Sequence, residues 1–305
     1  MSEFLLETHG LTKQYGHHKA ADDVNLHIKK GAIYGFIGRN GAGKTTCLRM
    51  IAGLARPTSG EISLFGYTGS RLSQVRSRVG CLIETPGLYK NMTAYENLKV
   101  KCLMAGIKKK GYIEDILESV GLSDTGNKRV KNFSLGMKQR LGVGLALVGE
   151  PDLLVLDEPI NGLDPQGIAE VRDAVQRLCD EKNMTIIISS HILEELSKIA
   201  TDYGIIHNGS LIQELTREEL MKRCSERIEI TLDNPQSALP VLDNMGFVNY
   251  QVTDKNHIYI FERLDESASL NMELARHGIF VKGISITSEE LESYFLSLTG
   301  GAENA

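Results

Sequence analysis

A glycine-rich segment, residues 38–45, carries the residue types that bind a chain of phosphates. It reads, in order, Gly38, Arg39, Asn40, Gly41, Ala42, Gly43, Lys44 and Thr45, and it matches the pattern G-x-x-x-x-G-K-[ST]. Glycines let the backbone curl so that several N–H groups face one anion, and a helix that follows adds its positive end. The lysine of this pattern reaches the terminal phosphates, and the threonine hydroxyl can ligate Mg²⁺. We therefore expect a site for a nucleoside triphosphate with Mg²⁺.

A pair of carboxylates, Asp157 and Glu158, follows the apolar run 153–156. A strand over this run would place Asp157 at its C-terminal tip, where ligands bind in open parallel sheets. Asp157 can then hold Mg²⁺ through water, and Glu158 can orient and deprotonate the attacking water. An acidic pair after a strand is otherwise most often a solvated turn. The phosphate-binding segment decides between the two interpretations and favours hydrolysis of the nucleotide.

His191 follows a second apolar run, residues 186–188, and two serines. A lone histidine at the end of a strand is more often structural. Beside a phosphate site it can bond a γ-phosphate oxygen and help to fix the attacking water. Because Asp157 and His191 follow successive predicted strands, we expect one site that contains both.

The elements that must position these residues alternate between strands and helices, which predicts a parallel sheet. Residues 32–37 are apolar on both faces, as in a buried parallel strand, and a helix is expected over residues 45–54. Residues 24–28 alternate and predict one strand. The stretch 93–149 is mostly helical in pattern: residues 93–96 have the spacing of a capping box, and Ser134 can cap a later helix.

Composition changes near residues 216–226, a charged stretch with a helical pattern. Beyond it the predicted order is β-α-β-β-α-β, which indicates a small α+β domain of the ferredoxin-like type. The expected strands cover residues 227–232, 250–252, 257–261 and 280–286. The expected helices cover residues 237–245, 267–278 and 288–298.

Composition excludes several classes of protein. The net charge of −5 provides no positive field for nucleic acid. The 5 cysteines are odd in number and form no C-x-x-C pair, which argues against a disulfide framework or a zinc site and for a reducing compartment. The first residues do not form a signal peptide, and no run of eighteen apolar residues occurs. We therefore expect a cytoplasmic chain whose membrane role, if any, comes through a partner.

With these motifs in place, the chain resembles the ABC ATPases over about residues 4–220. Tyr15 stands where that family places an aromatic ring on adenine, although a core aromatic at a sheet edge is the other interpretation. Residues 79–84 match the coupling loop, 133–137 the signature usually written LSGGQ, and 161–165 the loop that touches the opposite subunit. The resemblance implies a P-loop NTPase cassette over residues 1–220, with a helical subdomain at about 90–150 and a second domain at 226–300.

The resemblance also implies residue roles. ATP would be bound by Tyr15, by the segment 38–45 with Thr46, and by Ser134 and Gly136 of the signature. Thr45, Asp157 and Glu84 would face Mg²⁺, and Glu158 and His191 would be catalytic. In the family the signature closes over the nucleotide of a second cassette, head to tail, with Asp164 in the contact. One cassette per chain then implies a homodimer, or a heterodimer with a similar chain.

The chain departs from the family pattern in two places, and the first of them takes part in a resemblance to one branch. Glu84 stands where Gln is usual, and the signature has Leu135 and Met137 where Gly and Gln are usual. Glu84, the sequence of residues 83–89 and the C-terminal segment 291–296 resemble the corresponding segments of the self-protection exporters for bacitracin and lantibiotics. Glu84 can also be an ordinary surface substitution.

The expected function is therefore an ATPase subunit that energises an ABC exporter of peptide antibiotics. It would lie on the inner face of the membrane through separate transmembrane permease subunits. Two other functions stay open at this point. A soluble ABC ATPase acting on nucleic acid or ribosomes usually has two cassettes or a long coiled coil, and this chain has neither. A regulator that binds nucleotide without turnover is suggested by the altered signature, whereas Glu158 and His191 argue against it.

Overall fold

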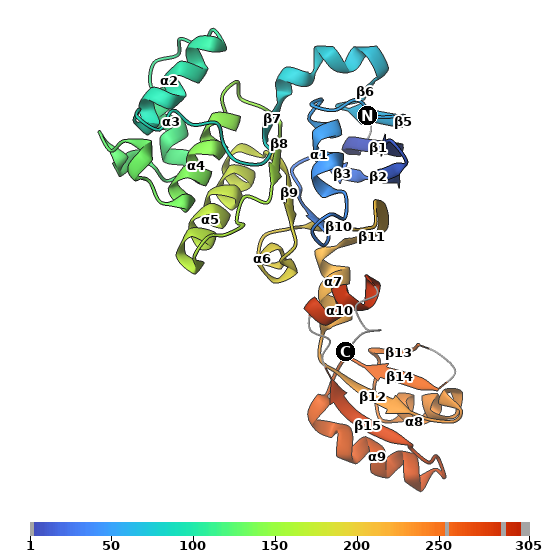
Figure 1. Cartoon of the computed structure of the whole chain (residues 1–305). Coiled ribbons are helices and arrows are strands. Elements are labelled where there is room, and N and C mark those ends of the chain that lie inside the picture. The colour runs from blue at the N-terminus through green and yellow to red at the C-terminus, as the bar shows by residue number, and fades with distance from the viewer. Residues whose placement is uncertain (1–2, 254–255, 288–290, 300–305) are drawn as a thin grey trace. The chain divides into compact units, whose positions relative to one another are not determined.

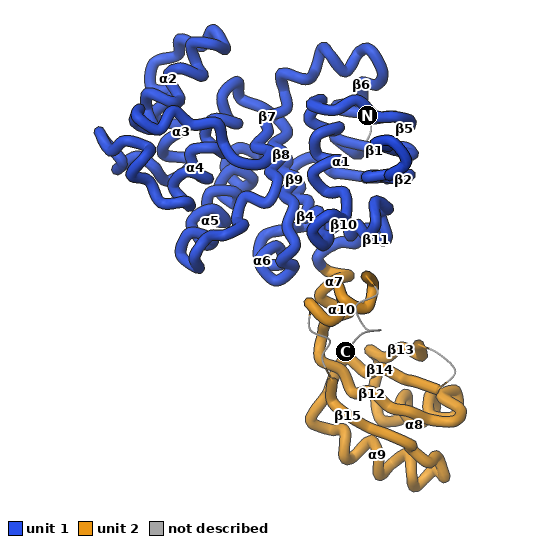
Figure 2. The backbone as a smooth tube through the Cα atoms, viewed as in Figure 1, with its two compact units in different colours: residues 1–217 blue, residues 218–305 orange. Residues whose placement is uncertain are grey.

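The structure is a computed structural model that describes residues 3–253, 256–287 and 291–299. The chain divides into two compact units, Met1–Arg217 and Glu218–Ala305, coloured blue and orange in Figure 2. No helix among the described residues has the length and apolar character needed to cross a bilayer. The first residues of the helix expected over 288–298 lie outside the described residues.

A six-stranded sheet forms the centre of the first unit, in the order β11-β10-β4-β9-β8-β7 (Figure 1). The strands from β10 to β7 are parallel, and β11 pairs antiparallel with β10. Every residue of β4, β8 and β9 is buried, which explains their continuous apolar runs. The strands are β4 (Ile33–Ile37), β7 (Val79–Leu82), β8 (Leu153–Asp157), β9 (Thr185–Ser190), β10 (Asp202–His207) and β11 (Ser210–Thr216).

A second, antiparallel sheet packs with the first through helix α1 (Lys44–Ile51). Cys47, Leu48, Met50 and Ile51 of this helix are fully buried in a core that both sheets share. The strands are β1 (Phe4–Tyr15), β2 (His18–Val24), β3 (His27–Lys29), β5 (Ser59–Leu64) and β6 (Tyr67–Thr68). The single strand expected over residues 24–28 was wrong: β2 ends at Val24, and the chain re-enters the sheet as β3 on the other side of Asn25 and Leu26.

The middle of the first unit is helical, and α2, α3 and α4 lie together on the far side of the sheet from α1 (Figure 1). The predicted capping box is confirmed: Thr93 Oγ1 accepts from Glu96 N, and the Glu96 side chain accepts from Thr93 N. Ser134 is the N-cap of α4, as predicted. The helices are α2 (Ala94–Met104), α3 (Tyr112–Ser119), α4 (Leu135–Ala146), α5 (Pro165–Lys182) and α6 (Leu193–Ser197).

The second unit has the predicted β-α-β-β-α-β order, with a sheet in the order β13-β14-β12-β15. All its neighbouring strands are antiparallel, which is the ferredoxin-like arrangement. Isoleucines of β12 and β14 pack with leucines of α8 and α9 in one core. The elements are α7 (Arg217–Cys224), β12 (Arg227–Thr231), α8 (Leu239–Asn244), β13 (Tyr250–Val252), β14 (His257–Ile260), α9 (Ser267–Arg276), β15 (Gly283–Thr287) and α10 (Leu291–Leu298).

Candidate nucleotide and catalytic site

The glycine-rich segment forms a loop between the buried strand β4 and helix α1. Gly43 is the N-cap of α1 with φ of 107°, a conformation that side chains rarely adopt. A Cβ on Gly43 would lie 2.3 Å from the Ala20 carbonyl oxygen, so the loop passes close to β2 at this point. A pocket of about 190 Å³ is lined by residues 40–46 of the loop and the helix start, together with Ala20 and Glu158. Of the segment expected to bind nucleotide, residues 40–46 line this pocket, whereas Gly38 and Arg39 do not.

Lys44 connects the loop to the carboxylates. Its side chain is buried, and its Nζ donates to the carbonyl oxygens of Gly38 at 2.5 Å and Arg39 at 3.3 Å. The same Nζ lies 3.0 Å from Glu158 Oε1. The ammonium group is thus held at the pocket by the loop on one side and by a carboxylate on the other.

Asp157 lies at the C-terminal end of β8, beside the first turn of α1. Thr45 Oγ1 donates to Asp157 Oδ2 at 2.7 Å. Ser189 Oγ donates to Asp157 Oδ1 at 2.6 Å and accepts from Glu158 N at 2.9 Å. Ser189 was not among the predicted site residues. Its position follows from the register of β8 and β9, which pairs it with Asp157, and the only signal in the sequence is a serine after the apolar run 186–188.

Glu158 turns its carboxylate back to the pocket through an unusual backbone conformation. Its φ is 49°, in the left-handed region that a non-glycine residue occupies at some cost. Oε1 faces Lys44, and Oε2 lies 2.9 Å from His191 Nδ1. The structure therefore brings Lys44, Thr45, Asp157, Glu158 and His191 together, as the sequence predicted. Such a group can bind a phosphate chain and activate a water beside it.

The expected coupling residue Glu84 lies apart from these residues. It follows β7 with φ of 63°, and its carboxylate forms an ion pair with Arg49 of α1. Its link to the nucleotide loop is therefore a charge contact with the helix that the loop starts.

The residues assigned to a second cassette and to the adenine ring stand outside this cluster. Tyr15 ends β1 opposite His18, half exposed, with Lys13 Nζ 5.0 Å from its ring centroid. Ser134 Oγ accepts from Met137 N at the exposed start of α4, and α4 and α1 occupy separate parts of the unit (Figure 1).

Gly136 of the signature and Asp164 of the following loop lie where the starts of α4 and α5 meet. Asp164 is the N-cap of α5 and accepts from Gly167 N at 3.0 Å. A Cβ on Gly136 would lie 3.3 Å from the Gly167 Cα. Glycine at position 136 therefore lets the starts of α4 and α5 approach closely.

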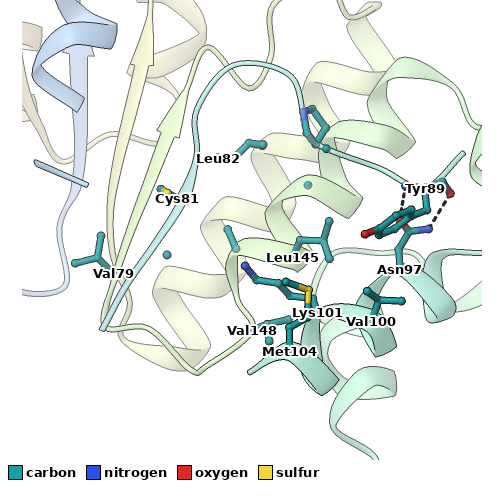
Figure 3. Close-up of a pocket in the computed structure, with 15 residues that line it drawn as sticks. Val79, Cys81, Leu82, Tyr89, Asn97, Val100, Lys101, Met104, Leu145 and Val148 are labelled. Carbon is teal, nitrogen blue, oxygen red and sulfur yellow. Dashed lines mark hydrogen bonds between the residues drawn. The ribbon is translucent and has the colours of Figure 1, made fainter. Parts of the chain in front are cut away.

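A separate groove of about 340 Å³ lies between β7 and the helical region (Figure 3). Cys81 and Leu82 form one wall, and Lys101 and Met104 of α2 contribute to the other. The Asn97 side chain holds the segment between β7 and α2, since its Oδ1 accepts from Tyr89 N and its Nδ2 donates to the Tyr89 carbonyl oxygen. Tyr89 and Met104 are strongly exposed for residues of their kind. The groove thus offers a surface of mixed polar and apolar side chains next to the segment that carries Glu84.

Comparisons with known proteins agree with this site. Residues 21–161 match the family model described as ABC transporter. The chain is 43% identical over 299 residues to the bacitracin transport ATP-binding protein BcrA of Bacillus licheniformis, covering 97% of this chain and 98% of that protein. It is 45% identical over 210 residues to the lantibiotic transport ATP-binding protein SrtF of Streptococcus pyogenes, covering 69% of this chain and 90% of that protein.

Solved structures agree with the fold. An ATP-binding subunit of an ABC transporter matches with a TM-score of 0.62 at 30% identity, over 72% of this chain and 92% of that one. An ATP-binding cassette in its ADP conformation matches with a TM-score of 0.66 at 26% identity, over 73% of this chain and 95% of that one. The predicted P-loop NTPase fold is confirmed. The chain belongs to the ATP-binding subunits of ABC transporters, a family of ATPases.

Proposed function

We propose that this chain binds and hydrolyses ATP to energise an exporter of peptide antibiotics. The observation that carries the proposal is the cluster of Lys44, Thr45, Asp157, Glu158 and His191, of which Lys44, Thr45 and Glu158 line one pocket. The assignment of the cargo rests on the relatives, because two proteins of similar length are named for transport of bacitracin. The linearmycin resistance ATP-binding protein LnrL of Bacillus subtilis, 32% identical over 97% of this chain, is named for resistance to a different antibiotic and supports antibiotic export in general.

The residues of the cluster divide the chemistry between them. The loop N–H groups and Lys44 bind the β- and γ-phosphates, as in other loops of this pattern. Glu158 orients the attacking water and accepts its proton, and His191 holds the carboxylate through Oε2. Lys44, 3.0 Å from Oε1, exchanges this carboxylate for phosphate oxygens when ATP binds. Tyr15 is assigned to the adenine ring.

Thr45 and Asp157 fit a bound Mg²⁺. Their oxygens are 2.7 Å apart and are of the hard type that Mg²⁺ prefers. Among the described residues no three His, Cys, Asp or Glu side chains form a metal cluster, which suits an ion that keeps water and substrate phosphates as ligands. The ion would neutralise charge on the phosphates. Glu84, the third candidate ligand, is paired with Arg49.

Two chains would assemble head to tail, each signature closing over the other chain's nucleotide. The exposed N-terminus of α4, with Ser134 as its cap, is suited to an anion brought by a second chain. Asp164 would lie in the same contact. We assign the ABC domain to residues 1–220, with its helical subdomain at about 90–150, and the ferredoxin-like domain to residues 226–300.

The groove between β7 and α2 would receive a separate transmembrane permease subunit and hold the chain on the inner face of the membrane. Exposed apolar side chains line it, and it adjoins Glu84, which contacts the nucleotide helix through Arg49. This continuity supports a path from nucleotide to partner.

Resistance of living cells tests the proposed cargo. A strain that lacks the chain is complemented with wild type, with Glu158→Gln, or with the matched surface variant Glu150→Gln. We expect wild type and Glu150→Gln to restore resistance to bacitracin or to a lantibiotic, and Glu158→Gln to fail at equal expression. If all three strains are equally sensitive to every peptide antibiotic tried, the cargo assignment is wrong.

A further inference from the structure

A further pocket, of about 430 Å³, lies entirely within the ferredoxin-like unit. Its walls come from α7, from the start of β12, from β13 and β14 and from α10. The volume lies within the range of small-molecule sites. No residue of the ATPase cluster takes part in it.

The lining of this pocket is rich in cations. Lys222 and Arg223 of α7 and Arg227 of β12 line it, and Glu219 is the only carboxylate among its described lining residues. Glu229, the next acidic residue on the same face of β12, contacts Thr287 and His257 instead. Among the described lining residues, positive charges therefore outnumber negative ones, although the chain as a whole has a net charge of −5.

Arg227 has binding capacity that the protein does not use. Its Nη1 donates to the Arg223 carbonyl oxygen at 3.1 Å, and its Nε is buried without a hydrogen-bond partner. It forms no ion pair with a carboxylate in the described part of the chain. A buried guanidinium N–H without an acceptor is costly, so an oxyanion that accepts from it would be stabilised.

Aromatic rings hold both arginines in place. The Arg227 guanidinium carbon lies 4.2 Å from the Tyr259 ring centroid. Arg223 Nη1 donates to the Tyr294 hydroxyl at 2.6 Å, with its guanidinium 5.7 Å from that ring. Phe261 adds a third ring to the lining. Rigid planar cations beside aromatic faces suit a ligand that has both an oxyanion and a flat ring.

We propose that this pocket binds a small aromatic ligand that carries a phosphate or a carboxylate. The oxyanion accepts hydrogen bonds from Arg227 and is attracted by Lys222 and Arg223. The ring of the ligand packs against Tyr259 and Phe261. The site is distinct from the ATP site and gives the second unit a ligand-binding role of its own.

Fluorescence of a single tryptophan tests the proposal, because the chain contains no tryptophan. Tyr259→Trp keeps an aromatic ring beneath Arg227 and places the reporter in the pocket. The full chain, saturated with MgADP to fill the cassette, is titrated with phenyl phosphate, benzoate and inorganic phosphate. Calorimetry of the wild-type chain under the same conditions checks that the reporter has not created the site.

We expect saturable binding of phenyl phosphate or benzoate, and the stronger of the two identifies the oxyanion. Inorganic phosphate should bind at least tenfold more weakly, because it lacks the ring. Arg227→Gln should weaken binding of the aromatic anion at least tenfold. Arg227→Lys should weaken it less, since lysine keeps the charge but loses the planar fork. Arg276→Gln, which removes an exposed arginine of α9, should leave binding unchanged.

Three results would overturn the proposal. The first is the absence of saturable binding of either aromatic anion up to about 10 mM, well beyond the weakest useful affinity. The second is equal affinity in Arg227→Gln and Arg276→Gln when both variants unfold at the wild-type temperature. The third is inorganic phosphate binding as tightly as phenyl phosphate. ATP hydrolysis is measured in parallel, so loss of this site is separable from failure of the ATPase assignment.

Discussion

At the scale of single residues, Glu158 has a neighbour at each of its oxygens, and the contact at Oε1 is an ion pair without hydrogen-bond geometry. Lys44 Nζ lies 3.0 Å from Oε1, and His191 Nδ1 lies 2.9 Å from Oε2. Binding of phosphate would draw Lys44 towards the nucleotide and leave Oε1 to face the attacking water. His191 then keeps the orientation of the carboxylate through Oε2.

His191→Ala should therefore slow hydrolysis more than it weakens nucleotide binding. We expect the ATPase rate to fall about 100-fold, at the lower end of the range for a positioned acid–base group, and MgATP affinity to change little. Steady-state phosphate release and calorimetry measure the two quantities. His277→Ala removes an exposed histidine of the second unit and is the matched control. Equal rates in the two variants would show that His191 has only a structural role.

The sequence predicts most of this site but not the contacts that tune it. Phosphate loops have a fixed spacing, and the carboxylates follow an unmistakable apolar strand, so Lys44, Thr45, Asp157 and Glu158 can be placed from sequence. Ser189 cannot, because its contact with Asp157 depends on the pairing of β8 with β9. The Arg49–Glu84 ion pair likewise joins residues 35 positions apart that the fold brings together.

At the scale of elements, two helices begin at residues that the resemblance assigns to the dimer. Ser134 caps α4 and Asp164 caps α5. A capping role alone would explain both residues, because either side chain satisfies a free N–H group of its helix. Substitution at Ser134 can separate the cap from a role towards nucleotide.

Ser134→Asp should keep the helix and lose the activity. Aspartate is as good a cap as serine, whereas Ser134→Ala costs about 1 kcal/mol of stability. The added negative charge, however, would face the γ-phosphate held by the second chain. We expect Ser134→Asp to unfold like wild type and to hydrolyse ATP at least tenfold more slowly. Ser134→Ala, by contrast, should be less stable than wild type and should lose less of its hydrolysis rate than Ser134→Asp does. Near-normal hydrolysis by Ser134→Asp would restrict Ser134 to capping.

Strand β4, which leads into the phosphate loop, is tied to β11 by a buried tyrosine. Tyr34 Oη donates to Glu214 Oε1 at 2.6 Å, and His27 Nδ1 lies 2.7 Å from Glu214 Oε2. Burial, and next the Glu214 charge, raise the pKa of Tyr34 well above its usual value of 10.0. The unfolded chain ionises this phenol near its usual pKa, whereas the folded chain keeps the proton. Tyr34 therefore contributes stability below pH 10 that is lost as the pH rises further.

Tyr34→Phe tests this linkage. At pH 8 the variant should be less stable by about 1 kcal/mol, the typical value of one buried hydrogen bond. At pH 10.5 the difference should shrink by about 1 kcal/mol, because only wild type loses free energy of unfolding when the unfolded tyrosine ionises. Urea unfolding at both pH values measures the difference. A difference that is constant with pH would contradict the assignment.

The ends of strands are the part of the fold that sequence predicts least well. Residues 24–28 alternate like one strand, yet β2 and β3 pair with β1 separately. The strand expected over 280–286 starts only at Gly283, and Phe280 is 84% exposed. An apolar side chain at a strand end carries no information on whether a partner strand reaches that far. By contrast, the order β-α-β-β-α-β rests on whole segments and was predicted correctly.

At the scale of the whole molecule, the groove beside β7 is the surface through which the chain would act on a membrane partner. Met104 is 79% exposed at its edge, and no residue of the ATPase cluster lines this groove. Met104→Glu should leave the ATPase rate of the isolated chain within about twofold, because surface substitutions away from special sites cost little stability. Resistance in cells should fall to the level of the strain without the chain. Met272→Glu, an equally polar change on exposed α9, should retain resistance, and equal resistance in both strains would place the partner elsewhere.

The central claim is that Glu158 is the base of an ATPase that works as a pair of chains. Steady-state MgATP hydrolysis, with light scattering of the same samples, tests it most directly. We predict that Glu158→Gln binds MgATP, accumulates as a dimer and hydrolyses at least about 100-fold more slowly than wild type, in keeping with loss of a positioned base. Hydrolysis by Glu158→Gln at a rate close to wild type would contradict the account.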